Sequence, residues 1–221
     1  MNLIPNKKMT TFFIVLLYFI IGFTYSYLRY IEFGKYDFLA DANFILNKAF
    51  TIVSVLSIST SYMISIFSKA GFKFFKKKVE FKRYFGLTGF YFICFHVFFA
   101  VRLIKPGYMP QFYDLNSEIA VRGQLVILLG IVAFLFMLFP AVSSIGDIMK
   151  KLGAQKWLRL QRMGYYGFFV VMLHSSLIGF DKWNNFESWQ GGMPPITLLM
   201  AMIILFVLVM RLFIVVYHSK K

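Results

Sequence analysis

Long uninterrupted stretches of apolar residues constrain this sequence more than any other feature. A helix that crosses the hydrocarbon core of a bilayer needs about 20 apolar residues, and this chain offers such a stretch six times. The predicted membrane spans are residues 11–28, 44–67, 86–104, 124–142, 163–180 and 195–217. Only 15% of the 221 residues are charged, whereas a soluble domain carries about 25%. The sequence therefore predicts an all-α, polytopic membrane protein whose single domain, residues 1–221, is a six-transmembrane-helix bundle.

Basic residues are distributed unevenly between the segments that flank and connect these spans. The N-terminus, residues 68–85, residues 143–162 and the C-terminal tail carry 16 of the 24 lysines and arginines. The other three connecting segments carry six, together with seven of the nine acidic residues. Under the positive-inside rule, this asymmetry predicts that both termini are cytoplasmic and that the protein is a multi-pass protein of the cell (inner or plasma) membrane. Because topology and contact with anionic lipid explain the net charge of +15, we expect the lipid membrane as a partner and no nucleic acid.

The spans lack several side chains on which transmembrane chemistry often depends. No aspartate or glutamate falls within a predicted span, which argues against a carboxylate proton relay, because intramembrane carboxylates mark the pathways of pumps and carriers. The chain also contains no phosphate-binding loop and no dinucleotide-binding fingerprint. Its one cysteine, Cys94, lies within a span, where we expect a buried thiol that behaves as a small hydrophobe.

Two of the three histidines, His96 and His174, lie deep inside apolar spans, whereas His218 lies near the C-terminus, where we expect a solvated side chain at the interface. Each of the first two ends a G-x-x-G-F-x5-H pattern that follows an arginine, Arg83 or Arg162. The histidines come 13 and 12 residues after these arginines, so each lies about 18–20 Å along its helix. Because both spans run in the same direction, we expect the two imidazoles at nearly the same depth, slightly toward the outer side.

Two imidazoles at one depth suit the two axial positions of a haem iron, because the porphyrin supplies the other ligands. Zinc fits less well, since it needs more protein ligands and no further histidine, cysteine or carboxylate is available at this depth. The absence of C-x-x-C-H excludes covalent attachment and favours one haem b. Because the protein would occupy both axial positions, the expected task is electron transfer rather than oxygen binding.

Gly89 and Gly167 each lie seven residues before one of these histidines, two turns away on the same face of the helix. Lacking side chains, they would let a flat macrocycle lie close to both helices, so they join His96 and His174 as predicted cofactor-binding residues. Ordinary close packing of membrane helices is the alternative for the glycines, and interhelical hydrogen bonding is the alternative for the histidines. Three outer basic residues are candidates for neutralising haem propionates, with anchoring at the interface as the alternative: Arg102, Lys105 and Arg122.

With these motifs, the chain resembles the ferric reductase-like transmembrane domain family, and within it the haem-binding membrane subunits of the periplasmic methionine sulfoxide reductase system. The resemblance covers roughly residues 45–180. It rests on R-x-x-G-x-x-x-F-x5-H, which ends in His96, on Ser143-Ser144, and on L-G-x3-W-x2-L-Q-R-x2-Y-x8-H, which ends in His174. In that family the corresponding histidines ligate b-type haem, and the resemblance carries this metal-binding role onto His96 and His174.

One position departs from the family pattern, which often has a histidine where this chain has Gln161. Relatives with two haems pair that histidine with another on the third span, where this chain has Lys82 and Arg83. The resemblance therefore implies a single haem in the outer half of the membrane.

The resemblance also implies a role as the electron-transfer subunit of a membrane oxidoreductase, which passes electrons toward a periplasmic or extracellular acceptor. The expected donor is a quinol or a separate cytoplasmic flavin reductase, so that a quinone or a flavin would come with the donor. The expected acceptor is a periplasmic reductase or a metal such as ferric iron. A different class stays open at this point, namely a haem-free six-helix carrier, channel or assembly factor in which the histidines only link helices.

Overall fold

Residues 6–219 of the chain are described by a computed structural model, and most of them are helical. The long helices are α1 (Lys7–Tyr27), which the π-helical turn η1 (Leu28–Glu32) extends, α2 (Phe38–Lys69), α4 (Phe81–Leu103), α5 (Val121–Ser143), α6 (Gly146–Trp183) and α7 (Ile196–Ser219). The short elements are α3 (Lys73–Lys76) and the 3-10 turns η2 (Pro110–Phe112), η3 (Phe186–Ser188) and η4 (Gln190–Gly192). Within residues 6–219 there is no β-strand, and one isolated bridge joins Tyr113 to Ile119.

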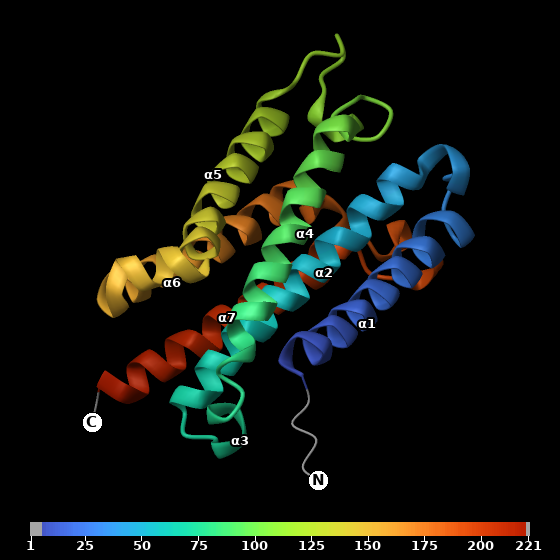
Figure 1. The fold of residues 1–221 in the computed structure, drawn as a ribbon. Helices are drawn as coiled ribbons and strands as arrows, with labels where there is room; N and C mark the ends of the chain where they lie inside the picture. The colour runs from blue at the N-terminus through green and yellow to red at the C-terminus, as the bar shows by residue number, and fades with distance from the viewer. Residues whose placement is uncertain (1–5, 220–221) are drawn as a thin grey trace.

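Six of the helices are long and apolar enough to cross a membrane, namely α1, α2, α4, α5, α6 and α7. They run through the whole length of the molecule as a bundle of inclined helices (Figure 1). The predicted all-α fold with six spans is therefore confirmed, and the chain is a multi-pass membrane protein.

The helices extend further than hydropathy alone predicts. Residues 143–162, expected as a connecting segment, are helical from Gly146 onward, and α4 begins at Phe81 rather than near residue 86. Lysine, arginine, glutamine and leucine are good helix formers, so the helix continues where the apolar stretch has ended. Gly153 interrupts α6 with a φ of +70°, a conformation that glycine adopts without the steric penalty of a Cβ atom.

Helix α2 lies at the centre of the bundle, where it contacts α1, α4 and α7, whereas α5 packs chiefly against α6. Buried small hydroxyl residues allow its neighbours to approach closely: Ser54, Ser57, Ser59 and Ser61. Large apolar side chains such as Phe98 and Leu128 are exposed on the outside of the bundle, as expected of a surface that faces lipid. The thiol of Cys94 is exposed on α4 as well, so the expectation that it is buried was wrong, and within a span it faces lipid rather than protein.

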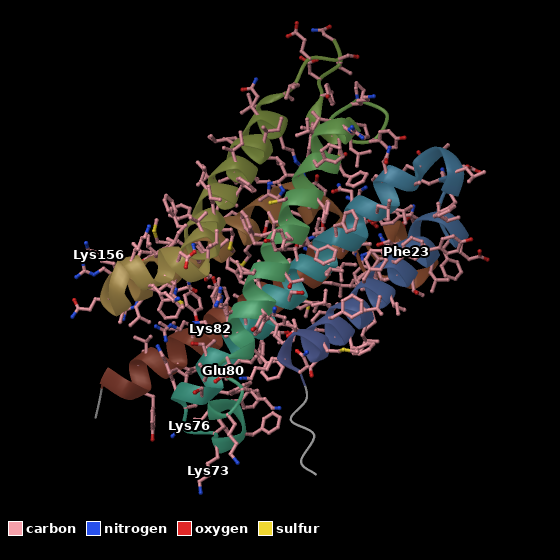
Figure 2. All side chains as sticks on the ribbon, in the orientation of Figure 1. Phe23, Lys73, Lys76, Glu80, Lys82 and Lys156 are labelled. Atoms are coloured by element: carbon pink, nitrogen blue, oxygen red, sulfur yellow. The ribbon has the colours of Figure 1, made fainter. Side chains whose placement is uncertain are left out.

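The two ends of the bundle differ in charge. One of them, called the basic end below, holds the start of α1, helix α3, the start of α4 and the start of α6. Lys73, Lys76 and Lys156 project from it (Figure 2). The opposite end holds η1 and residues 104–120 and 184–195. The uneven charge of the sequence thus separates the two ends of one bundle, while the cytoplasmic position of the basic end stays a prediction.

Candidate functional site

The imidazole of His96, on α4, is hydrogen-bonded to two side chains of α2. Its Nδ1 lies 2.7 Å from Oδ1 of Asn47 and 2.9 Å from Oγ1 of Thr51. The Thr51 hydroxyl donates its own proton to the backbone carbonyl of Asn47 at 2.9 Å, so it acts as an acceptor toward the ring. Because both partners accept, His96 carries its proton on Nδ1 and donates it to α2.

The imidazole of His174, on α6, is held by the backbone of α5. Its Nδ1 lies 2.9 Å from the carbonyl oxygen of Val126, which can only accept, so this ring too is protonated on Nδ1. Gly130 leaves room for the contact, since a Cβ atom at that position would lie 3.2 Å from Cε1 of His174. A side chain at residue 130 would therefore press on the ring.

The two histidines share one tautomer, and it is the one that leaves Nε2 with a free lone pair. Within residues 6–219, no hydrogen bond is made by Nε2 of either ring. Metal-ligating histidines characteristically donate the other ring N–H to a carbonyl, carboxylate or similar acceptor, which fixes the ring and raises its basicity. Both imidazoles thus have the hydrogen bonding expected of iron ligands, and the group predicted from the sequence fits the donors that are present.

The fold brings the two imidazoles near one another although 78 residues separate them in the sequence. They are near enough for an electrostatic interaction between the rings, and both side chains are only partly buried. In the part of the chain that the structure describes, no group of three or more histidines, cysteines and carboxylates could hold a metal. The donor set at this level of the membrane is therefore the pair of imidazoles.

Gly89 and Gly167 pack against neighbouring helices. A Cβ atom on Gly89 would lie 2.5 Å from Cγ1 of Ile58 on α2, and one on Gly167 would lie 3.1 Å from Cβ of Phe136 on α5. These contacts give both glycines the helix-packing role that was the alternative for them. The two glycines thereby set the spacing between α2 and α4 and between α5 and α6, the helices that hold the histidines and their hydrogen-bond partners. A direct role of the glycines beside a macrocycle stays a prediction.

Two of the three outer cations that the sequence singled out have partners within the protein. Arg122 forms an ion pair with Asp181 and donates from Nε to the carbonyl of Leu177 at 2.8 Å, while the guanidinium of Arg102 lies 4.1 Å from the ring centre of Phe98. Lys48 lies one residue from Asn47 and interacts electrostatically with both histidines.

The sequence alone does not place Lys48 near the histidines, because that proximity depends on how α2 packs. Its ammonium lies 4.8 Å from the ring centre of Phe44, and the other charges that act on it are the cations Arg29 and Lys182. Among residues 6–219 it forms no ion pair with a carboxylate. A positive charge at this position suits an anionic group, so Lys48 joins Arg102, Lys105 and Arg122 as a candidate partner for haem propionates.

A cavity of about 540 Å³ lies at the basic end, between α2, α4, α5 and α6. Its wall contains Gln161, which stands where the family often has a histidine, and Lys82 and Arg83, which stand where two-haem relatives have the partner histidine. Neither His96 nor His174 lines it. The residues that replace the second histidine pair of two-haem relatives therefore lie together in the fold, separate from His96 and His174.

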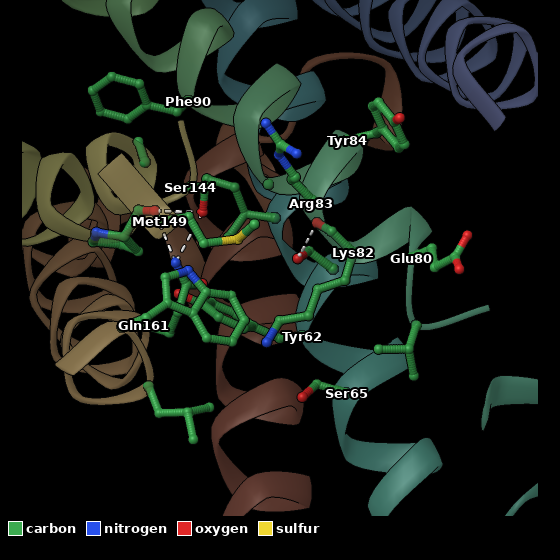
Figure 3. A pocket seen from close by; sticks show the side chains of 18 of the residues that line it. Tyr62, Ser65, Glu80, Lys82, Arg83, Tyr84, Phe90, Ser144, Met149 and Gln161 are labelled. Atoms are coloured by element: carbon green, nitrogen blue, oxygen red, sulfur yellow. Dashed lines mark hydrogen bonds between the residues drawn. The ribbon is translucent and has the colours of Figure 1, made fainter. Parts of the chain in front are cut away.

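The side-chain amide of Gln161 is engaged in holding the end of α5 (Figure 3). Its Nε2 lies 2.9 Å from the Pro140 carbonyl oxygen and 2.9 Å from the hydroxyl of Ser144. The last carbonyls of a helix have no partner within that helix, and Gln161 supplies one from α6. Glutamine at this position therefore links two helices.

No family model matches the chain. Over 132 residues it is 30% identical to the magnetosome protein MamZ of Magnetospirillum gryphiswaldense, an overlap of 53% of this chain and 20% of that protein. MamZ of Paramagnetospirillum magneticum is 26% identical over 132 residues, with the same coverage. Over 98 residues the chain is 28% identical to the protein-methionine-sulfoxide reductase heme-binding subunit MsrQ of Rhodospirillum rubrum. This overlap covers 44% of each protein.

These similarities are partial, since the chain spans less than half the length of each of these curated relatives. The similarity to MsrQ fits the family-level resemblance that the histidine motifs indicated.

Proposed function

We propose that this protein is a b-type cytochrome, the electron-transfer subunit of a membrane oxidoreductase, in which His96 and His174 hold one haem. The observation that carries this proposal is the shared tautomer of the two rings. Each donates Nδ1–H to a fixed acceptor, Asn47 and Thr51 in one case and Val126 in the other. Two helices that only exchanged a hydrogen bond through these histidines would not need both Nε2 atoms unengaged.

The residues around the histidines have distinct tasks in this proposal. The haem would supply one-electron redox chemistry at its iron. Asn47, Thr51 and the Val126 carbonyl orient the rings and set their basicity, which tunes the potential. Lys48 provides a positive charge for the propionate carboxylates, and the apolar side chains of the spans keep water away.

The proposed electron path runs from the basic end of the bundle toward the opposite end. With the basic end in the cytoplasm, electrons would arrive there from a quinol or a cytoplasmic flavin reductase and leave toward a periplasmic reductase or ferric iron. MsrQ is named as the heme-binding subunit of a protein-methionine-sulfoxide reductase, which supports a reductase subunit as the acceptor. The absence of a second histidine pair in the wall of the basic-end cavity supports one haem per chain.

A reduced-minus-oxidised absorbance spectrum of the purified full-length protein, produced with ample haem, tests the proposal. We expect a b-type spectrum with about one haem per chain, lost in His96→Gly and in His174→Gly. Added imidazole should restore the spectrum in both variants, because it replaces the deleted ligand. His218→Ala is the matched control and should retain the haem; its side chain lies outside the part of the chain that the structure describes. A colourless wild-type protein would overturn the cytochrome assignment.

A further inference from the structure

The cavity at the basic end has a charged mouth and an apolar interior. Lys69 and Ile58 both line it and lie 11 residues apart on α2, so the cavity extends about 16 Å along that helix. Apolar groups form its inner wall: Ile58, Phe90, Met137 and Ala141. This shape suits a molecule with an ionic head and an apolar tail, and it opens where α2 and α4 reach the end of the bundle.

Positive charge dominates the mouth. Four basic residues line the cavity against one acidic residue: Lys7, Lys69, Lys82 and Arg83 against Glu80. Glu80 is taken up by an ion pair with Lys7. Among residues 6–219, Lys82 forms no ion pair with a carboxylate. Figure 3 shows the Lys82 ammonium reaching into the cavity toward Tyr62 and Ser65, whereas Glu80 points away from it.

The polar wall of the cavity is also rich in hydrogen-bond donors. Nε1 of Trp157 is buried and has no acceptor within residues 6–219, and the Lys82 ammonium lies 5.7 Å from the centre of the Trp157 ring. The hydroxyl of Ser65 lines the same cavity. Indole and ammonium groups donate but do not accept, so this wall is complementary to a ligand that only accepts, and phosphate oxygens are of that kind.

We propose that this cavity binds the phosphate group of an anionic phospholipid, with the phosphate at Lys82 and Arg83 and the acyl chains along the inner wall. Basic pockets between transmembrane helices are a recognised form of anionic-headgroup site. A soluble phosphate compound would meet the cations but leave the apolar wall in contact with water, which favours the lipid. The proposal does not depend on haem, because neither histidine lines the cavity.

The test uses the full-length protein in detergent, with Trp183→Phe and Trp189→Phe so that Trp157 is the one tryptophan left of three. Its fluorescence is followed during titration with dioctanoyl phosphatidylglycerol, with dioctanoyl phosphatidylcholine and with glycerol 3-phosphate. A second set in the His96→Ala/His174→Ala background removes quenching by haem and separates this proposal from the cytochrome assignment. We expect a saturable change with phosphatidylglycerol in both backgrounds and a much weaker one with the other two compounds.

Charge variants decide whether the cavity is the site. Lys82→Gln should weaken binding of phosphatidylglycerol by about fivefold, Lys82→Gln/Arg83→Gln should weaken it further, and Lys82→Arg should retain it. Lys156→Gln removes the same charge at the same end of the bundle but outside the cavity wall, and it should bind as the wild type does. An equal loss in Lys156→Gln, equal binding of phosphatidylcholine, or no saturable signal would overturn the proposal. Equal binding of glycerol 3-phosphate would replace the lipid with a soluble phosphate compound.

Discussion

Oδ1 of Asn47 lies 2.7 Å from Nδ1 of His96 and fixes the tautomer of a ring that belongs to a different helix. Asn47 is buried, so water does not compete for this hydrogen bond. The position of the imidazole therefore depends on how closely α2 and α4 pack as well as on the sequence of α4.

Removing this acceptor should weaken haem binding without removing the ligand. Asn47→Leu is expected to lower haem affinity by about 10–100-fold, the usual cost of losing such a partner, and to change the reduction potential. Haem titration and potentiometry measure both quantities. Ser57→Ala is a suitable control on the same helix, because that buried hydroxyl has no partner within residues 6–219. Unchanged affinity and potential in Asn47→Leu would contradict the assigned role of Asn47.

Gln161 should contribute to stability. Gln161→Ala removes the donor that the hydroxyls of Ser143 and Ser144 share, and one of the three donors to the Pro140 carbonyl, so the free energy of unfolding should fall by about 1–3 kcal/mol. Thermal unfolding in detergent reports the change. Gln155→Ala on the same helix is the control, because Gln155 is exposed and should tolerate the substitution. Equal losses in the two variants would show that the bonds of Gln161 add nothing.

The two glycines of the first motif should respond differently to alanine. A Cβ atom on Gly89 would lie 2.5 Å from Cγ1 of Ile58 and 3.2 Å from the backbone oxygen of Ser54, whereas one on Gly86 would meet only the Ser61 hydroxyl at 3.4 Å. Gly89→Ala should therefore destabilise the protein by about 1–3 kcal/mol and loosen haem binding. Gly86→Ala should be neutral or slightly stabilising, because alanine favours the helix. The comparison uses thermal unfolding and haem content, and reversal of the order would be inconsistent with this packing.

Lys48 should affect the redox equilibrium. A positive charge near the haem favours the reduced state, so Lys48→Met is expected to lower the midpoint potential by on the order of 50 mV. Potentiometric titration of the purified protein measures the shift. Arg102→Met removes a charge from the same end of the bundle, at a residue whose guanidinium lies over Phe98, and should have a smaller effect. An equal shift in both variants would point to a general field effect rather than to a propionate partner.

The predicted topology can be tested by labelling single cysteines in a Cys94→Ser background. Lys76→Cys lies at the basic end and Leu115→Cys lies in the fully exposed loop at the other end. A membrane-impermeant maleimide applied to intact cells should label the cysteine at residue 115 and should label the one at residue 76 only after lysis. The opposite pattern would invert the bundle and reverse the proposed direction of electron flow.

Local sequence was enough to predict the six spans, because a span depends on properties that lie within one helix. The assignment of His96 and His174 as a haem-binding pair stays a prediction. The repeated spacing before His96 and His174 predicts their depth, since the helical rise is constant. What the pattern could not provide is anything that depends on which helices are neighbours. The acceptors Asn47 and Val126 lie on other helices than the histidines they hold, at sequence separations of 49 and 48 residues. No local periodicity marks them.

Helix neighbours also decide which side of a span faces protein, and the sequence does not provide that information. The packing of Gly89 against α2 and of Gly167 against α5 could not be read from their shared spacing, and their role beside a macrocycle stays a prediction. Cys94 was expected to be buried, whereas it is exposed, because hydropathy does not tell the protein-facing side of a span from its lipid-facing side. The distribution of basic residues, in contrast, correctly predicted which connecting segments lie at the same end of the bundle, because it depends on the sequence of those segments alone.

The two imidazoles differ in how readily mutation can retune them. The partner of His174 is the main-chain oxygen of Val126, which every amino acid at residue 126 would present in the same way. The partners of His96 are side chains, Asn47 and Thr51, and each can be exchanged for a stronger, weaker or charged acceptor. In the proposed cytochrome, changes that tune the redox potential are therefore expected to accumulate on α2, while the hydrogen-bond acceptor on α5 stays constant.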